Sequence, residues 1–441
     1  MKKSSMIVLI AAIASQSISA QPRQWTLREC CDYAVSHNIS IKQQENQCRL
    51  QEIQLSNARN QRLPDLSGSV SQNFSFGRGL TADNTYSNTN TSSTSFSLGT
   101  SIPLFTGFQI PNQIKMNQLN LEAATADLEK AKNDIQMQVA QAYVQILYDM
   151  EIADVARRQV AIDSMQVVRL QAMVDNGKAS GAQLSQQQAT LANSRLTATQ
   201  ADNTKRLAIL SLTQLLELPS PDGFAILPPE ISAISGTGQV PSPDVIYADA
   251  IGLKPEIAAQ QLRLKATDHN IKIARAGYMP TLSLSGGMGS NYYTTSKFSS
   301  DPFSTQLKNN FSQYIGLNLS VPIFNRFQTR NSIRHAKIEQ LNQQLTFDNT
   351  KKTLYKEIQQ VYYNTLNAQQ KEQSSAEAVR SSQDAFTLMQ AKYENGKATI
   401  TEFNEAKNTY LRAESDYVQA RYELLYQRAL IQFYRGRDLT F

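Results

Sequence analysis

The chain has 441 residues and a formal net charge of +6, from 43 Lys and Arg against 37 Asp and Glu. Because the two signs alternate along the predicted helices, we expect a solvated surface and no nucleic-acid partner. The three cysteines, Cys30, Cys31 and Cys48, are too few for a disulfide framework, and we interpret them as packing residues.

Residues 1–20, "MKKSSMIVLIAAIASQSISA", have two lysines, a short apolar run and then small residues up to Ala20. This order is typical of a secretory signal peptide, and the apolar run is too short to be a membrane anchor. No later stretch is apolar enough to cross a bilayer as a helix. The sequence therefore predicts an exported protein, in which any membrane crossing is made by strands.

After a predicted helix at Thr26–Gln61, two segments at 66–78 and 91–105 alternate apolar with small or polar residues. Period-two alternation over such lengths is a weak signature of membrane-barrel strands, and a soluble sheet is the alternative. A second pair of such segments occurs at 282–294 and 311–324. Four strands cannot close a barrel, and open sheet edges are not tolerated in lipid. If the strands lie in a membrane, several chains must pool them.

Long helices are predicted at Gly107–Asp175 and Arg326–Glu394, each about 100 Å long at 1.5 Å per residue. The first carries apolar residues every seven positions, which predicts coiled-coil packing. That series is Val139, Ile146, Ala153, Val160, Val167 and Val174. Shorter helices such as Ser180–Leu216 are about half as long, so two laid end to end match one long helix and predict a rod.

The sequence "NGKA" stands at 176–179 and again at 395–398, a step of 219 positions. "SIPLFTGFQ" (101–109) and "SVPIFNRFQ" (320–328) repeat with the same step, which indicates a duplication. The glycine of each "NGKA" is placed to end a long helix. Ser180 with Gln183, and Thr399 with Glu402, then fit capping boxes that start the returning helices. We expect two helix reversals, both at the end of the rod opposite the strands.

The duplication, the paired strands, the Pro-Leu-Phe and Pro-Ile-Phe segments (103–105, 322–324) and the glycine-containing tips together resemble the TolC-like outer-membrane efflux proteins. The resemblance covers nearly all of the chain after the signal. It implies a mainly α-helical homotrimer that pools twelve strands into one barrel in outer-membrane lipid and twelve helices into a periplasmic tunnel. It also implies a passive exit duct for a tripartite efflux pump or type I secretion system. Its partners would be a periplasmic adaptor and, through it, an inner-membrane transporter.

The resemblance divides the chain into segments. These are a signal peptide (1–20), an N-terminal helix (21–65), a first barrel hairpin (66–105), a first helical hairpin (106–217), a connector (218–244), a helix of the second repeat (245–278), a second barrel hairpin (279–324), a second helical hairpin (325–435) and a tail (436–441).

The resemblance also implies roles for individual residues. Glu402 and Glu405 match acidic residues that line the family's aperture, although Glu402 is also the capping-box residue and acidic residues suit a first helical turn. Tyr393 matches a gating tyrosine, or is a packing residue, and Gln183 stands where its acidic partner would be; a Tyr–Gln hydrogen bond is the expected replacement. Gln186 is the uncharged counterpart at the first tip. The expected adaptor contacts are Asn176, Gly177, Lys178, Asn395, Gly396 and Lys397, and the expected barrel–tunnel junctions are Pro103 and Pro322.

We find no sign of an enzyme, a cofactor or a metal site. The glycine-lysine pairs at 177–178 and 396–397 lack the earlier glycine and the following Ser or Thr of a phosphate loop. His37, His269 and His335 are too scattered for a metal site or a catalytic triad. The alternative function is an exported coiled-coil structural protein or adhesin with no pore.

Overall fold

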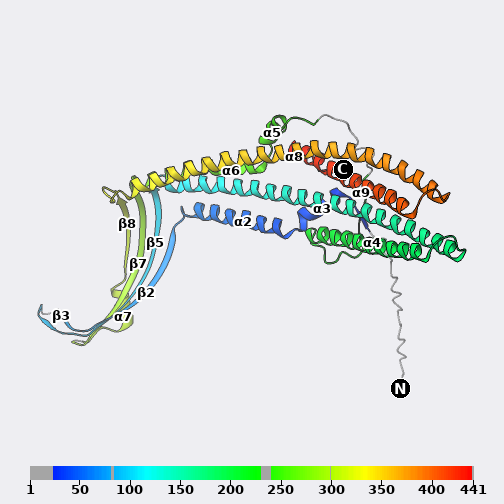
Figure 1. Cartoon of the computed structure of the whole chain (residues 1–441). Helices are drawn as coiled ribbons and strands as arrows, with labels where there is room; N and C mark the ends of the chain where they lie inside the picture. The colour runs from blue at the N-terminus through cyan, green and yellow to red at the C-terminus, as the bar shows by residue number, and fades with distance from the viewer. Residues whose placement is uncertain (1–22, 81–83, 230–239, 298, 440–441) are drawn as a thin grey trace, which may run out of the picture. The chain divides into compact units, whose positions relative to one another are not determined.

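The computed structural model describes residues 23–80, 84–229, 240–297 and 299–439. The predicted signal peptide and the middle of the predicted connector lie outside these residues. The chain divides into two units, and each is described by itself. Unit 1 comprises the residues up to Ile39, Asn133–Ile246 and those from Ile358 onward; unit 2 comprises Ser40–Lys132 and Tyr247–Glu357. Two helices of 67 residues, α3 (Gln109–Asp175) and α8 (Gln328–Glu394), are labelled in Figure 1. Each contributes residues to both units.

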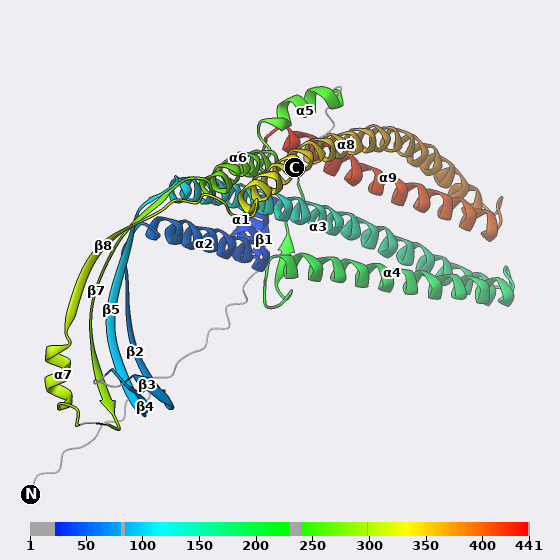
Figure 2. The ribbon, with the colours of Figure 1, turned by 90° about the vertical axis from the view of Figure 1, so that its left-hand side faces the viewer.

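Unit 2 contains an antiparallel sheet of four strands in the order β2-β5-β7-β8 (Figure 2). The strands are β2 (Asp65–Ser75), β5 (Thr91–Thr106), β7 (Thr281–Thr295) and β8 (Ser312–Ser320). The two hairpins predicted from the sequence adjoin through β5 and β7, with Leu98 opposite Met288. Within the described residues, β2 and β8 are the outer strands of this sheet, each with one edge unpaired by another strand.

The sheet has one face rich in apolar side chains and one face rich in serine and glycine, which also carries Tyr293 and Tyr314. The register places Val70 opposite Phe96 on the apolar face and Ser69 opposite Ser97 on the polar face. This is the period-two alternation expected of strands. Much of the apolar face is uncovered in the single chain, where Ile315 is 86% exposed and Leu317 68% exposed. A contiguous apolar surface of this kind marks contact with a partner or a membrane.

The polar segments at the far ends of the hairpins contain elements that we did not predict. They are β3 (Arg78–Leu80), β4 (Tyr86–Asn88) and the short helix α7 (Phe303–Asn309). The side-chain amide of Gln306 on α7 accepts from the backbone N–H of Tyr293 at 2.9 Å and donates to its carbonyl at 3.0 Å. The pairing of β7 with β8 ends where Gly289 lies opposite Ser312. Gln306 therefore supplies hydrogen-bond partners to the backbone of a part of β7 that β8 does not reach.

Two predicted helices are each broken in the structure. The segment Thr26–Gln61 forms α1 (Leu27–His37) and α2 (Ile39–Asn60), because Asn38 is extended and its side-chain amide donates to the carbonyl of Leu215 at 3.0 Å. Residues 245–278, expected to be one helix, contain the end of α5 (Pro243–Ile251) and all of α6 (Pro255–Ala276). Pro255 occupies the first turn of α6, where a missing N–H costs nothing.

Among the described residues, unit 1 contains α1, the start of α5, two helical hairpins and a two-stranded parallel sheet. The hairpins pair the second half of α3 with α4 (Gly181–Leu215) and that of α8 with α9 (Ile400–Tyr434), and the sheet pairs β1 (Arg23–Trp25) with β6 (Phe224–Ile226). The hydroxyl of Tyr143 on α3 lies 3.1 Å from the carbonyl oxygen of Trp25, at the end of β1, and 2.5 Å from that of Leu227, directly after β6, so it ties the ends of both strands to the helix. Of the predicted heptad series, Val139, Ile146 and Ala153 are fully buried, and the later members are half-buried.

Candidate functional site at the helical tips

The two "NGKA" segments close α3 and α8 with the same geometry. Gly177 and Gly396 have φ of 65° and 69°, in the left-handed region that glycine adopts without strain. The N–H of Lys178 donates to the carbonyl of Met173 at 2.8 Å, and the matching bond from Lys397 also measures 2.8 Å. These bonds are those of a Schellman helix end.

The asparagines of the two segments also cap the helix ends. Asn176 donates its side-chain amide to the carbonyl of Ala172 at 2.7 Å, and Asn395 donates to that of Ala391 at 2.8 Å. The backbone N–H of each asparagine donates to the same carbonyl, at 3.3 Å in Asn176 and 3.2 Å in Asn395, so the side-chain amide adds a second bond to the last turn of each helix.

Both predicted capping boxes are present. At the first tip, Gln183 accepts from the N–H of Ser180 at 3.1 Å, while its own N–H donates to the Ser180 hydroxyl at 3.3 Å. At the second tip, Glu402 accepts from the N–H of Thr399 at 2.7 Å and from its hydroxyl at 2.8 Å. The bond from the Thr399 backbone, then that from its hydroxyl, and the charge of Lys392 lower the pKa of Glu402.

Two carboxylates are exposed on the first turns of α9. Glu402 and Glu405 are three residues apart, which places them on neighbouring positions of one helix face. Glu402 is held by its capping bonds, whereas the Glu405 carboxylate has no hydrogen bond or ion pair among the described residues. At the first tip, Gln183 and Gln186 are exposed and uncharged. Negative charge at this position is thus confined to the second hairpin.

The side chain of Tyr393, near the end of α8, is held in place by contacts of its aromatic ring. The ring lies 5.1 Å from that of Phe403, and the guanidinium of Arg169 on α3 lies 5.2 Å from the Tyr393 ring centre. Arg169 also donates to the carbonyl of Glu394 at 3.0 Å, so it joins α3 to the end of α8. Burial raises the pKa of Tyr393, and the positive charge of Arg169 opposes this.

The hydrogen bond that we expected between Tyr393 and Gln183 does not form within the chain. The Tyr393 hydroxyl is buried and has no hydrogen-bond partner among the described residues. The oxygen of the Gln183 amide is occupied by the capping box. Within the single chain, the contacts of Tyr393 are therefore those of its ring.

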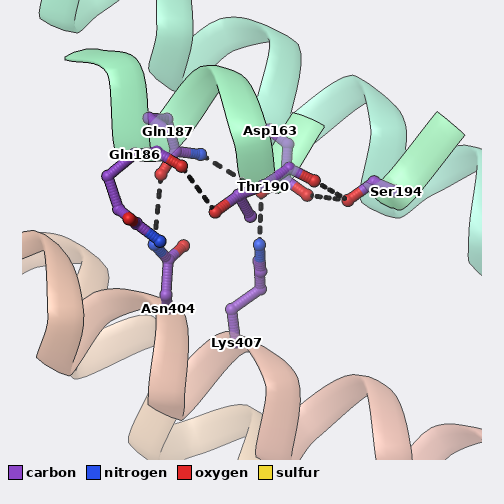
Figure 3. A network of polar contacts seen from close by, with 7 residues as sticks. All are labelled: Asp163, Gln186, Gln187, Thr190, Ser194, Asn404 and Lys407. Atoms are coloured by element: carbon purple, nitrogen blue, oxygen red, sulfur yellow. Dashed lines mark hydrogen bonds and ion pairs between the residues drawn. The ribbon is translucent and has the colours of Figure 1, made fainter. Parts of the chain in front are cut away.

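A buried polar network joins the two hairpins close to the tips, and sequence reasoning missed it (Figure 3). The ammonium of Lys407 on α9 forms an ion pair with Asp163 on α3, and both side chains are completely buried. Asp163 also accepts from the hydroxyl of Ser194 and, at 3.4 Å, from the amide of Gln187, both on α4. Gln187 in turn accepts from Asn404 at 3.1 Å. A sequence signal does exist, because Lys407 interrupts the apolar series Phe403–Leu411 at four-residue spacing.

Two further ion pairs join α3 to α9 beyond the pair of Asp163 and Lys407. Arg158 bonds to Glu414 at 2.6 Å, and Arg421 lies 3.4 Å from Glu151. Residues 407, 414 and 421 are spaced by seven and alternate in sign, with the opposite sign on α3 each time. Sliding one helix along the other by seven residues would bring like charges together, so the series favours the observed register of the two hairpins.

The strand–helix junctions repeat as the tips do. Pro103 lies in β5 next to a register shift, whereas Pro322 lies beyond the end of β8, which stops earlier than the predicted 324. The ring of Phe105 packs edge-on against Phe108 at 5.3 Å. The equivalent pair in the second repeat, Phe324 and Phe327, packs in the same way at 5.4 Å.

Among the described residues, no helix is both long and apolar enough to cross a membrane. In the same part of the chain, no three His, Cys, Asp or Glu side chains gather to hold a metal ion. The groups that the tips present are exposed carboxylates, a buried ion pair and capped helix ends.

A family model described as outer membrane efflux protein matches residues 32–217 and 246–437. The chain belongs to the outer membrane efflux protein family. It is accordingly assigned to the outer membrane, in a family whose members are efflux channels and transporter components.

Individual members of the outer membrane efflux protein family are distant from this chain in sequence. The outer membrane efflux protein BepC of Brucella suis is 23% identical over 402 residues, which are 89% of this chain and 82% of BepC. The outer membrane protein OprJ of Pseudomonas aeruginosa is 23% identical over 423 residues, covering 93% of this chain and 83% of OprJ.

Solved structures share the fold over nearly the whole chain. A membrane protein from Pseudomonas aeruginosa superposes with a TM-score of 0.78 at 19% identity, covering 93% of this chain and 92% of that one. The open state of the Neisseria gonorrhoeae MtrE outer membrane channel gives 0.74 at 18% identity, covering 94% and 88%. At these identities the likeness shows the fold alone.

Proposed function

We propose that this protein is a homotrimeric outer-membrane channel that serves as the passive exit duct of a tripartite efflux pump or type I secretion system and is closed at its helical tips. The observation that carries the proposal is the exposed pair Glu402 and Glu405, at the start of α9, in a chain of the outer membrane efflux fold. Three copies would bring six carboxylates together, which attract cations and repel anions.

The open sheet supports the trimer. Lipid does not tolerate unpaired strand edges, so the outer edges of β2 and β8 require partners if the sheet lies in a membrane. Pairing β8 of one copy with β2 of the next closes a barrel of twelve strands from three copies. The apolar face would then contact outer-membrane lipid, and the serine-rich face would line a wet lumen.

The tips are the proposed contact with other proteins. Asn176, Gly177, Lys178, Asn395, Gly396 and Lys397 are all exposed, and the two sets share one backbone geometry. A trimer would present six similar tips to a periplasmic adaptor, which in turn holds the inner-membrane transporter. Tyr393 would help to keep the tips closed through its contacts with Phe403 and Arg169.

Conductance in planar lipid bilayers tests the proposal. The wild type is compared with a tip variant, Glu402→Gln with Glu405→Gln. A matched control, Glu377→Gln with Asp384→Asn, removes two exposed carboxylates from α8 instead of α9. We expect a small cation-selective current that divalent cations reduce, lost selectivity in the tip variant and unchanged behaviour in the control.

The other outcomes each remove part of the proposal. A large current that the tip substitutions leave unchanged would keep the duct and place its gate elsewhere. A folded protein that never forms a pore would favour the exported coiled-coil structural protein or adhesin.

A further inference from the structure

Basic residues gather where the helices of unit 2 meet the sheet, in contrast to the alternation of charge elsewhere. Residues 53–64, 107–121, 269–280 and 321–338 contain no Asp or Glu. They contain nine exposed cations, which we call the basic patch: Arg59, Arg62, Lys115, Lys272, Arg275, Arg326, Arg330, Arg334 and Lys337. In the whole chain the two signs nearly balance, 43 against 37, so composition does not explain the patch.

The four segments lie at one end of the strands of the sheet. The start of β2 lies opposite the end of β5, and the start of β7 opposite the ends of β5 and β8. A Cβ placed on Gly107 would lie 2.6 Å from the Cβ of Met279, so the segment just before α3 touches the segment just after α6. Thr329 at the start of α8 donates to the carbonyl of Gly277 at 3.3 Å. The basic patch therefore occupies one zone of unit 2.

The cations of the patch are not neutralised within the chain. Among the described residues, none of the nine forms an ion pair with a carboxylate. Arg330 lies over the Phe327 ring at 4.4 Å. Arg330 and Arg334 stand in the first two turns of α8, where the helix dipole disfavours positive charge. Apart from the cation–π contact of Arg330 with Phe327, the charges of Arg330 and Arg334 have no stabilising partner among the described residues, and they are available to an external anion.

Exposed apolar side chains separate the patch from the sheet. They are Leu63, Phe108, Tyr278, Ile323, Phe324 and Phe327, each more than half exposed. Apolar sheet face, aromatic side chains and cations follow one another in the order of a bilayer's hydrocarbon, interface and headgroups. Arg330 and Arg334 lie about 3 and 9 Å along α8 from its start, which is comparable with the thickness of one headgroup layer, about 5–8 Å.

We propose that the basic patch binds the phosphate groups of anionic phospholipids in the leaflet that faces the helices. This inference rests on the proposed membrane position of the sheet, but on neither the gate nor the cargo. Aromatic side chains at the interface set the depth of the sheet, and the arginines then select lipids of negative charge. Arg326, Arg330 and Arg334 contribute most, because they form the densest part of the patch.

The test measures lipid selectivity of the full-length protein in vesicles. Spin-labelled phosphatidylglycerol or spin-labelled phosphatidylcholine is added to phosphatidylcholine vesicles that contain the protein, and the motionally restricted fraction gives the relative association constant. We expect the wild type to prefer phosphatidylglycerol by about fivefold or more at low salt, with the preference lost in 1 M NaCl. R326Q/R330Q/R334Q should reduce the ratio to about one, and R326K/R330K/R334K should retain it.

A matched control removes three other exposed cations of α8, in K352Q/K356Q/R380Q, and should keep the wild-type ratio. Equal association of the two lipids with the wild type, or an equal loss in the control, would overturn the inference while leaving the channel proposal in place. Failure of the folded protein to float with vesicles would overturn both.

Discussion

Lys407 on α9 and Asp163 on α3 form an ion pair in which neither side chain has any exposed surface, although 244 residues separate them in sequence. Taking two charges out of water costs several kcal/mol per ion, which their attraction repays only with good geometry and further hydrogen bonds. Ser194 and Gln187 supply those bonds to Asp163. The pair therefore specifies how the hairpins meet more than it stabilises them.

Removing one partner should be far more damaging than removing both. Lys407→Met leaves Asp163 as an unpaired buried carboxylate, and Asp163→Leu leaves the ammonium alone. Each should lower the free energy of unfolding by about 3–5 kcal/mol, and the double variant should lose less than either. Denaturant unfolding of the detergent-solubilised protein, followed by circular dichroism, measures the three values.

The pair Lys371 and Glu423 provides the matched control, because it links α8 to α9 at 3.4 Å with side chains 53% and 30% exposed. Lys371→Met should change the free energy of unfolding by less than about 1 kcal/mol. Additive losses in the Asp163 and Lys407 double variant would show that the two charges do not interact.

The sequence predicts the features of this fold that depend on neighbours along the chain. Gly177 and Gly396 end the long helices because a left-handed residue is needed there, and Ser180 and Thr399 start the next ones. The position of the strands follows from their period of two. The break at Asn38 is different, because the side chain that creates it bonds to Leu215, 177 residues away.

In the candidate site, too, some features depend on neighbours along the chain and others on residues that are distant in sequence. The caps of Gln183 and Glu402 are local and were predicted, as was the acidic character of the second tip. The network around Asp163 depends on three helices meeting, and periodicity within one helix does not reveal which helices meet. The roles of Glu405 and Tyr393 in a trimer stay predictions, since they concern contacts between copies.

Glu402 caps the start of α9 and also carries negative charge at the tip. These two functions can be separated, because Gln183 shows that glutamine fills the same capping position. Glu402→Gln should keep the start of α9 intact and remove the charge, whereas Glu402→Ala should also fray the helix. Amide hydrogen exchange at Glu402 and Phe403 distinguishes the variants. Rapid exchange in Glu402→Gln would mean that the cap requires a carboxylate.

The same residue should make the tip sensitive to acid. The pKa of Glu402 is lower in the folded protein than its ordinary value of 4.5. The ionised carboxylate therefore contributes fully to the stability of the α9 start above pH 4.5, and this contribution is lost as the pH falls through the folded pKa. Exchange protection at the start of α9, relative to Glu402→Gln at the same pH, should therefore decline below about pH 4.5. Protection that declines equally in both proteins would assign the acid sensitivity to other groups.

Tyr393 should act through its ring. Tyr393→Phe removes a buried hydroxyl that has no partner among the described residues and should leave the conductance unchanged, with a gain in stability of up to about 1 kcal/mol. Tyr393→Ala removes the contacts with Phe403 and Arg169 and should raise the conductance of the closed channel. A higher conductance in Tyr393→Phe would instead show that the hydroxyl bonds to a neighbouring copy.

Gly107 should be the least replaceable glycine at the strand–helix junctions. Its φ is +62°, and an added Cβ would lie 2.6 Å from the Cβ of Met279 and 2.9 Å from the carbonyl oxygen of Ala276. Gly107→Ala should lower the free energy of unfolding by about 2–4 kcal/mol, since strain and overpacking add. Gly181→Ala is the control, because no atom lies within 4 Å of its Cβ position and alanine suits the first turn of α4. Denaturant unfolding measures the free energy of unfolding of both variants. Equally small losses would mean that the end of α6 can move to make room for the added Cβ, so that the junction is flexible.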